Sequence, residues 1–236
     1  MTTPSIIPIA AHSAPLATPS QMSLHSESGI GRNTLRFAPH EHLFFQGDAP
    51  KGVYEILSGT VIQYKVMADG RRQIQNFASE GDFLAMTFAD VHDLSAEALT
   101  DLEVLFVPRT MFDRRLQEQA GFRRSVFTLV SQMLHEAREQ ALLLGRKSAM
   151  ERTASFLIFL NDRFQDPATG YANIRMSRCD IADYLGLTLE TVSRMMNKLK
   201  KQNIIDLPQP NLFQVLNTSR LIALAGEVED ENYLAA

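Results

Sequence analysis

The spacing of hydrophobic and polar residues first follows a strand-like pattern. From Leu35 to about Pro108, short runs rich in β-branched and aromatic residues alternate with turn signals. The pair Asp69-Gly70, which follows a run of roughly alternating apolar and polar residues, favours a tight hairpin turn. Closely spaced short strands are typical of a sandwich or jelly roll, so the pattern predicts one of these two folds. The predicted strands are His42–Phe45, Gly52–Leu57, Thr60–Val66, Gln73–Phe77 and Glu103–Val107.

Between Thr110 and Lys147 the period of the pattern becomes helical. The stretch contains no proline, and its apolar residues recur at spacings of three and four. The stripe is narrow and resembles a coiled-coil seam more than a broad core face. We therefore predict a long dimerisation helix, with a helix packed on its own domain as the alternative. The predicted seam consists of Val126, Leu129, Met133, Ala137, Gln140 and Leu144.

The last part of the sequence predicts helices followed by two short strands. The second helix has a capping-box-like start, because Ser177 is followed three residues later by Asp180. A turn at residues 208–211, Pro-Gln-Pro-Asn, would join the two strands into a wing. The predicted helices are Ala154–Phe164, Cys179–Tyr184 and a third from about Thr188 to Lys201, and the strands are Ile204–Leu207 and Phe213–Leu216.

These patterns divide the 236 residues into an α+β chain of several parts. Residues 1–29 are rich in Ser, Thr, Pro and Ala, which predicts a disordered arm. A β domain at 30–115, a dimerisation helix at 116–147 and a winged helix-turn-helix domain at 148–226 follow. Residues 227–236 form an acidic tail.

The charge distribution favours a nucleic-acid partner, although the formal net charge is −4. Residues 1–145 carry 12 basic and 16 acidic side chains, whereas residues 146–226 carry 11 basic and 7 acidic ones. The tail contributes four more acidic residues. A phosphate backbone responds to the local patch within a Debye length of about 8 Å. The local excess of +4 is therefore more informative than the total.

Residues 177–199 have the pattern of a helix-turn-helix. Ile181, Ala182 and Leu185 form the inward side of a short helix, and Gly186 permits the positive φ of a tight turn. The following helix buries Val192, Met195, Met196 and Leu199 and presents polar residues on its other side. Such a helix fits the DNA major groove. The polar side consists of Glu190, Thr191, Ser193, Arg194, Asn197 and Lys198.

This polar side contains the side chains that discriminate bases. Arginine grips guanine O6 and N7, glutamate accepts from cytosine N4, and serine bonds to either kind of group. An ordinary helical hairpin with a solvated charged face is the alternative reading. Basic residues that flank the two helices are predicted to contact DNA phosphates, and they are Arg175, Arg178, Lys198, Lys200 and Lys201.

Two stretches resemble the cyclic-AMP receptor protein/FNR (CRP/FNR) superfamily of bacterial transcription regulators. They are Leu142–Arg152 (LLLGRKSAMER) and Asp180–Arg194 (DIADYLGLTLETVSR), within a resemblance from about residue 35 to 226. The ETVSR piece is similar to the FNR and FixK branch, whose members read a TTGAT-like half-site in a palindrome. The β domain would then be a cyclic-nucleotide-binding-like domain with the fold of a double-stranded β-helix (jelly roll).

The resemblance implies roles for individual residues and partners. Glu190, Ser193 and Arg194 would read bases, and Leu189 would pack on a thymine methyl. A homodimer would bind a TTG-N8-CAA-like palindrome in double-stranded DNA and act with RNA polymerase. The FixK-like group implies activation of genes for low-oxygen respiration or nitrogen metabolism.

The sequence departs from both sensor types of the superfamily. Residues 1–145 contain no cysteine, so the iron–sulfur cluster of the oxygen-sensing branch cannot be built. After Gly81-Asp82-Phe83-Leu84-Ala85 stands Met86 where the cyclic-AMP branch has the ribose-binding Glu. Leu94-Ser95 replaces its phosphate-binding Arg-Ser pair. We therefore expect no cofactor, with an unidentified effector in the β domain as the alternative.

Other candidate chemistry is weaker. His40-Glu41-His42 could be part of a cupin-like metal site, but an exposed strand end explains it better and no metal is expected. No catalytic triad or phosphate-cradling glycine loop is present, which argues against an enzyme. A cupin-like metalloenzyme with an accessory DNA-binding module is the alternative.

The single cysteine, Cys179, is predicted at the start of a helix beside Arg178. Helix amides and a neighbouring arginine favour thiolates, which oxidise readily, so redox sensitivity is one hypothesis and an inert side chain the other. No apolar run is long enough to cross a membrane, and prolines interrupt an N-terminus without basic residues before Arg32. We expect a cytoplasmic protein with no membrane partner.

Overall fold

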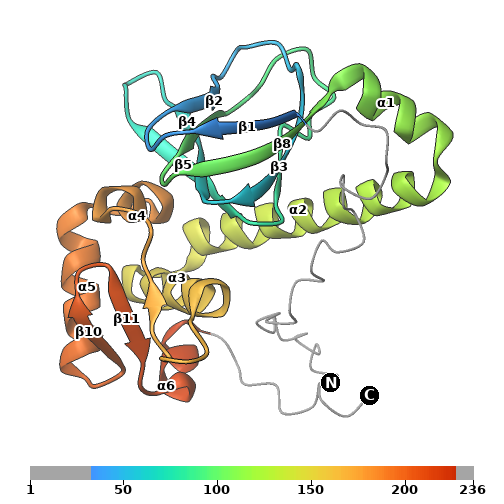
Figure 1. Ribbon diagram of the computed structural model, residues 1–236. Coiled ribbons are helices and arrows are strands. Elements are labelled where there is room, and N and C mark those ends of the chain that lie inside the picture. The colour runs from blue at the N-terminus through green and yellow to red at the C-terminus, as the bar shows by residue number, and fades with distance from the viewer. Residues whose placement is uncertain (1–32, 227–236) are drawn as a thin grey trace, which may run out of the picture. The chain divides into compact units, whose positions relative to one another are not determined.

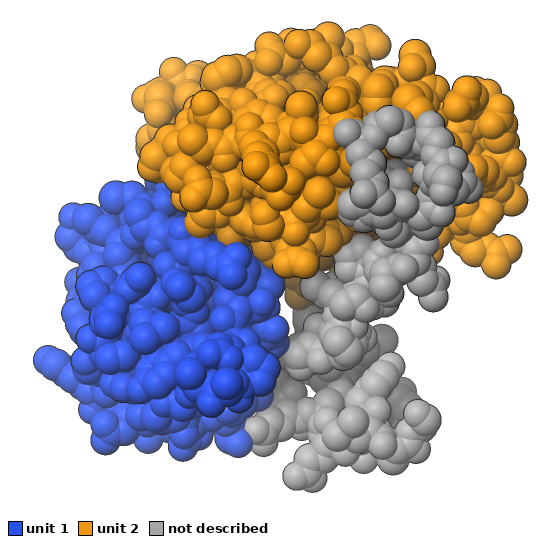
Figure 2. All heavy atoms as spheres, viewed as in Figure 1, with its two compact units in different colours: residues 1–15, 142–236 blue, residues 16–141 orange. Residues whose placement is uncertain are grey.

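The computed structural model describes residues 33–226 (Figure 1). Within this range the chain divides into two compact units, and Figure 2 shows them in different colours. We call residues 33–141 the β unit and residues 142–226 the C-terminal unit. The arm predicted at 1–29 and the acidic tail predicted at 227–236 lie outside the described residues.

The β unit contains two four-stranded antiparallel sheets. This arrangement confirms the predicted jelly roll and the α+β class. In sheet order, the first consists of β1 (Asn33–Phe37), β8 (Leu102–Pro108), β3 (Gly52–Ser58) and β6 (Phe83–Leu84). The second consists of β2 (His42–Phe44), β7 (Ser95–Ala98), β4 (Thr60–Val66) and β5 (Arg72–Ser79).

All five predicted strands are present, and three short strands escaped prediction. The turn at Asp69-Gly70 joins β4 to β5, and the Gly70 N–H donates to the Met67 carbonyl over 2.9 Å. Strand β7 was missed because its sequence, Ser-Ala-Glu-Ala, has no β-branched residue. It nevertheless pairs with both β2 and β4, and Ala96 and Ala98 are fully buried between the sheets.

A column of aromatic rings occupies the interior of the jelly roll. The His92 ring stacks on Phe44 with centroids 3.9 Å apart, Phe44 lies 6.0 Å from Tyr54, and Tyr54 lies 5.0 Å from Phe106. His92, Phe44 and Tyr54 are buried. Buried aliphatic and alanine side chains from both sheets surround this ring column. The interior is therefore a packed core.

Two helices complete the β unit. Helix α1 (Arg109–Glu118) and helix α2 (Ala120–Arg146) are separated at Gln119, which has an extended backbone. The helical pattern predicted from Thr110 to Lys147 covers both helices, but the prediction of one dimerisation helix at 116–147 missed the break at Gln119. A second core cluster, on the other side of the first sheet, contains Phe112 of α1 and Phe122 of α2. Helix α1 packs against β3 and β8.

The C-terminal unit combines four helices with a small sheet. The sheet is antiparallel with the strand order β10-β11-β9. The predicted helices and wing strands are present, whereas β9 and α6 were not predicted. The elements are α3 (Ala149–Phe164), β9 (Ala172–Asn173), α4 (Arg178–Leu185), α5 (Leu189–Lys201), β10 (Ile205–Gln209), β11 (Leu212–Val215) and α6 (Thr218–Leu224).

The wing turn is shorter than predicted. Strand β10 continues through Pro208 to Gln209, so the turn consists of Pro210 and Asn211. Its pairing with β11 shifts register between Asp206 and Gln209. This irregularity accommodates Pro208, which has no N–H to donate to a regular ladder. In the described range, no helix combines the length and hydrophobicity that crossing a membrane would require.

Candidate nucleic-acid interface

The helix-turn-helix is built by local hydrogen bonds. Ser177 caps α4 by accepting from the Asp180 N–H over 3.1 Å, and the Asp180 carboxylate accepts from the Ser177 N–H over 2.9 Å. Gly186 ends α4 in the left-handed conformation, with φ +60°. Thr188 caps α5 by accepting from the Thr191 N–H over 3.3 Å. The predicted capping box and turn glycine are therefore confirmed, and α4 packs against α5 (Figure 1).

The two helices bury the predicted apolar side, and the predicted polar side is exposed except at Thr191 and Ser193, which are half-buried. Ile181, Ala182 and Leu185 of α4 are buried. On α5, Met195 is half-buried, whereas Val192, Met196 and Leu199 are buried. We call the opposite side of α5 the reading face. Its residues line one open hollow, and they are Glu190, Ser193, Arg194, Asn197, Lys198 and Lys201.

The reading face presents both an anion and cations. The Glu190 carboxylate accepts from its own backbone N–H and from the Thr188 hydroxyl, and these bonds lower its pKa. It is therefore ionised at neutral pH and can only accept hydrogen bonds. Arg194 is exposed and donates through Nη2 to the Thr191 hydroxyl over 3.5 Å. Leu189 is exposed at the start of the same helix.

Two predicted phosphate contacts are already bonded to the wing. Arg178 donates through Nη2 to the Pro210 carbonyl over 2.7 Å, and Lys200 donates through Nζ to the Leu207 carbonyl over 2.7 Å. Both line a hollow between α5 and β10. Within residues 33–226, Arg178 Nη1 is buried and its N–H groups find no protein acceptor. Burial lowers the pKa of this guanidinium, which stays charged because its ordinary pKa is far above neutrality.

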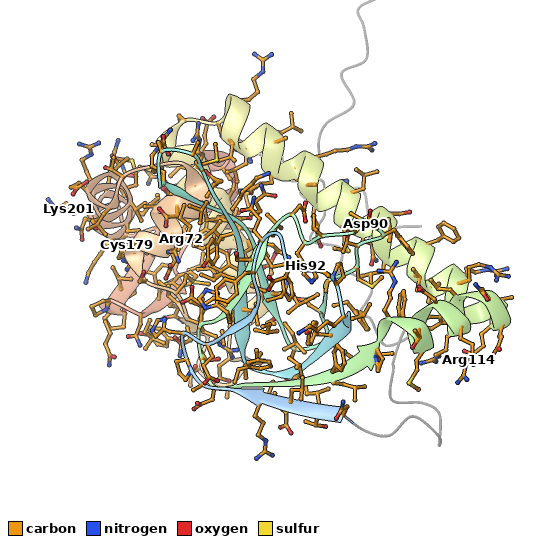
Figure 3. The ribbon with its side chains drawn as sticks, turned by 90° about the horizontal axis from the view of Figure 1, so that it is seen from above. Arg72, Asp90, His92, Arg114, Cys179 and Lys201 are labelled. Atoms are coloured by element: carbon orange, nitrogen blue, oxygen red, sulfur yellow. The ribbon has the colours of Figure 1, made fainter. Side chains whose placement is uncertain are left out.

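The other predicted phosphate contacts are exposed. Lys198 and Lys201 lie on the reading face, whereas Arg175 stacks its guanidinium 4.7 Å from the ring centre of Phe164. Cys179 is the second residue of α4 and is exposed (Figure 3). The exposed thiol is accessible to an oxidant, but its redox activity remains a prediction.

Three of the six positions of the seam predicted on α2 have packing partners within the chain, and the seam itself stays a prediction. Val126 is only 4% exposed and belongs to the core cluster of its own β unit, and Leu129 packs against that cluster. At the other end of the helix, Leu144 lies against Gly186, where an added Cβ would be 3.4 Å from Leu144 Cδ2. These side chains serve packing within one chain. Met133 and Gln140 are half-buried, and Ala137 is exposed.

An adjacent apolar stripe of α2 is exposed instead. Phe127 is 68% exposed, Val130 38% and Leu134 51%. With Ala137 and Ala141, which are also exposed, they recur at alternating spacings of three and four. This is the heptad pattern of a coiled coil. We call the five residues the exposed stripe; it is offset by about 100° on the helix from Val126 and Leu129.

The two histidines of the His-Glu-His segment bond to neighbouring side chains. His40 Nδ1 lies 3.0 Å from a Glu97 carboxylate oxygen, and His42 Nε2 lies 2.9 Å from the Tyr64 hydroxyl. Among residues 33–226, no three His, Cys, Asp or Glu side chains are grouped so that they could hold a metal ion. The segment contributes polar contacts to its sheet.

Arg152 is a candidate functional residue for which the sequence pattern predicted no role. Arg152 lies in the stretch at 142–152 that carries the family resemblance, yet only the structure shows its contacts. Its guanidinium bonds to three backbone carbonyls of the C-terminal unit. The carbonyls belong to residues 5 to 33 positions away, and sequence spacing does not reveal such contacts.

Comparisons with known proteins agree with this architecture. Residues 34–119 match the cyclic nucleotide-binding domain, and residues 151–224 match the Crp-like helix-turn-helix domain. The chain is 37% identical over 198 residues to the nitrogen fixation regulation protein FixK of Bradyrhizobium diazoefficiens, covering 83% of each chain. It is 37% identical over 193 residues to the transcriptional activatory protein AadR of Rhodopseudomonas palustris, covering 81% of this chain and 80% of AadR.

A solved structure supports the same assignment. FixK2 from Bradyrhizobium japonicum superimposes with a TM-score of 0.79 at 34% identity, covering 84% of this chain and 98% of FixK2. These relatives are regulators, so the alternative of a cupin-like metalloenzyme is wrong. Together with the helix-turn-helix and its polar reading face, the comparisons show that the chain belongs to the CRP/FNR family of DNA-binding transcription regulators, in its FixK-like branch.

Proposed function

We propose that this chain is a homodimeric transcription activator that binds a TTG-N8-CAA-like palindrome without a cyclic nucleotide. The observation that carries the proposal is the reading face, on which Glu190, Ser193 and Arg194 are presented together by a capped helix. Helix-turn-helix proteins insert such a helix into the major groove and read bases near its N-terminal end.

Each member of the reading face has a distinct base-reading chemistry. Arg194 can donate two hydrogen bonds to guanine O6 and N7, which no other base accepts in that geometry. The ionised Glu190 accepts from the N4 amino group of cytosine, and Ser193 bonds to either kind of group. Leu189 offers an apolar contact for a thymine methyl. This set of partners fits a half-site containing both G·C and T·A pairs.

Phosphate contacts would surround these base contacts. Lys198 and Lys201 extend from the reading face, and the guanidinium of Arg175 lies over the Phe164 ring. Arg178 and Lys200 keep N–H groups beyond those used by the wing carbonyls, because a guanidinium has five and an ammonium three. A phosphate oxygen is the natural acceptor for these groups.

The exposed stripe supports a homodimer formed through α2. Its large members, Phe127, Val130 and Leu134, would otherwise leave a contiguous apolar surface in water. The partner that fits it is a second copy of the same helix, because identical heptads pack by knobs into holes. A two-fold symmetric dimer reads a palindrome, whose half-sites are related by the same symmetry.

The β unit does not fit a cyclic nucleotide. By the resemblance to the cyclic-AMP branch, Met86 stands at the sequence position of the ribose-binding carboxylate and Leu94 at that of the phosphate-binding arginine, and Met86 packs on apolar side chains. A buried phosphate without a cationic partner carries a large desolvation cost. In addition, the ring column of Phe44, Tyr54 and His92 occupies the jelly-roll interior. These features support a regulator that is active without this ligand.

The relatives suggest the genes under control. FixK is named as a regulator of nitrogen fixation, and a 35% identical protein of Vibrio cholerae is named as a fumarate and nitrate reduction regulator. We therefore propose that this chain activates genes for low-oxygen respiration or nitrogen metabolism in the cytoplasm, where it would contact RNA polymerase.

Operator selection with purified, untreated protein tests the proposal. Random duplex DNA is expected to yield a TTG-to-CAA palindrome without any added ligand. Enrichment only after addition of a small molecule would instead support the alternative, an effector-gated regulator. Enrichment of unrelated DNA would overturn the base-reading assignment.

A second experiment concerns the thiol of Cys179. If it senses oxidants, peroxide weakens operator binding by the wild type but spares the Cys179→Ser variant, because serine cannot form a sulfenic acid. Equal loss of binding in both proteins would show that the cysteine has no sensing role.

A further inference from the structure

Arg152 forms an unusual set of hydrogen bonds inside the C-terminal unit. It is the fourth residue of α3, and its guanidinium donates to three carbonyls. Nε donates to Lys147 over 2.9 Å, Nη2 to Leu144 over 2.7 Å and Nη1 to Leu185 over 2.8 Å. The guanidinium group thus joins the end of α2 to the end of α4.

The acceptors are carbonyls that need an external partner. Leu144 lies in the last turn of α2 and Leu185 is the last residue of α4. The final four carbonyls of a helix have no intrahelical donor and carry its negative partial charge. A guanidinium suits two such helix ends at once, because its donors are fixed in one plane and its charge is permanent.

The turn of the helix-turn-helix lies against this contact. A Cβ added at Gly186 would be 3.4 Å from both Arg152 Nη1 and Leu144 Cδ2. The glycine therefore provides room as well as the positive φ of +60° that the turn requires. Arg152 and Leu144 together hold the turn that precedes the recognition helix α5.

The backbone that carries Arg152 is itself well defined. Only Lys147 and Ser148 separate α2 from α3. Ser148 and Glu151 form a capping box, in which the Glu151 carboxylate accepts from the Ser148 N–H over 2.6 Å. Lys147 donates through Nζ to the Ser155 hydroxyl over 2.7 Å. The base of the Arg152 side chain thus has a fixed position relative to the end of α2.

We infer that Arg152 is a positioning residue that fixes the helix-turn-helix to the last turn of the dimerisation helix. It thereby sets the separation of the two recognition helices in the dimer. The inference rests on the proposed homodimer. Two recognition helices must lie about 34 Å apart to enter successive major grooves on one side of DNA. A small rotation at the joint between α2 and α4 changes that separation.

The test compares the wild type with Arg152→Lys on palindromes whose half-sites are separated by 7, 8 or 9 base pairs. A single half-site with a scrambled partner is included. Lysine keeps the charge, but its point-like ammonium cannot reach three carbonyls in the geometry of a planar fork. Arg146→Lys is the matched control, because Arg146 is an exposed arginine at the end of α2, the helix end that Arg152 contacts.

We expect the wild type and Arg146→Lys to prefer one spacing by about tenfold or more in Kd. Arg152→Lys should bind the three spacings within about threefold of one another and retain its affinity for the single half-site. A purely structural role would instead lower affinity equally for every DNA. Equal losses, or an unchanged spacing preference in Arg152→Lys, overturn the inference.

Two further outcomes are distinguishable. If the wild type binds a palindrome no better than the single half-site, the proposed homodimeric function fails, and the inference fails with it. If Arg152→Lys does not fold, as judged by circular dichroism and thermal melting, Arg152→Gln is used. Glutamine retains two donors from one nitrogen, so it can satisfy only part of the carbonyl set. The same change in spacing preference is expected and the same results overturn the inference.

Discussion

The two units of this regulator differ in where their chemically informative side chains lie. In the β unit, the rings of Phe44, Tyr54 and His92 are buried in the ring column. In the C-terminal unit, the informative side chains are exposed on the reading face, and the apolar side of α5 packs inward. Residues of the first kind stabilise the fold, and residues of the second kind are available to DNA. Substitutions should therefore separate stability from binding.

The largest expected effect is on the stability of the β unit. Phe44→Ala should lower the free energy of unfolding by about 3–5 kcal/mol, because it removes a buried ring and leaves a cavity. Phe44 is 7% exposed, whereas its neighbour Phe45 is 51% exposed. Phe45→Ala, the matched control, should cost less than about 1 kcal/mol. Urea denaturation measures both values, and similar losses for the two variants would contradict a packed interior.

A smaller effect is expected on DNA affinity from the reading face. Arg194→Ala should weaken binding to the selected operator by about 1–3 kcal/mol and relax specificity at one guanine. The free energy of unfolding of this variant should change by no more than about 0.5 kcal/mol, because the Arg194 side chain is exposed. Fluorescence anisotropy with operator and single-base variants measures the change. Arg220→Ala, exposed on α6, serves as the control.

An unchanged specificity profile in Arg194→Ala would show that Arg194 does not read a base. If the wild type fails to distinguish operator from scrambled DNA, the whole assignment of the reading face is wrong.

Loss of a phosphate contact should change how DNA affinity depends on salt concentration. Lys201→Gln should reduce the slope of log K against log salt by about 0.9, the value for one lost phosphate contact on duplex DNA. The weakening should be similar for operator and non-operator DNA, since a phosphate contact carries no sequence information. Lys65→Gln, at an exposed position of the β unit, should leave the slope unchanged. Equal slopes for wild type and Lys201→Gln would exclude a phosphate contact at Lys201.

The smallest expected effect is a pH dependence of stability from His92 (Figure 3). Burial lowers the pKa of this ring, although Asp48 and Asp93 oppose the shift. The unfolded chain therefore binds a proton more readily than the folded one. Proton uptake by His92 therefore favours the unfolded chain. The free energy of unfolding is unaffected above the unfolded pKa of about 6.5 and declines as pH falls below it.

His92→Phe keeps a ring for stacking on Phe44 but cannot take up a proton. Its urea midpoint should consequently fall less between pH 7.5 and 5.5 than that of the wild type. The same decline in both proteins would assign the pH dependence to other groups.

Much of the C-terminal unit could be predicted because its signals are local. The Ser177–Asp180 capping box, the left-handed Gly186 and the apolar spacing of α5 each involve residues within four positions of one another. Helix geometry converts such spacings directly into a shared face or a cap. Helix α6 was missed because it is short and depends on packing Leu221 against α3.

The sequence by itself determined the helix-turn-helix, its reading face and the alternation of strands and turns in the jelly roll. Helix α2 shows the limit, because Val126 and Leu129 form one apolar stripe and Phe127 and Val130 form the next. Periodicity describes both stripes equally well. Only the tertiary structure decided that the first packs on the chain's own sheet and the second is exposed.

The same holds for contacts between distant segments. Arg178 meets the Pro210 carbonyl across 32 residues, and Arg152 meets the Leu185 carbonyl across 33. From the sequence alone, an arginine in a polar stretch could bind DNA or bond to the backbone of its own chain, because its long side chain can reach either. The partner is decided by which backbone carbonyls the fold leaves without a donor within reach, and that depends on the arrangement of whole helices.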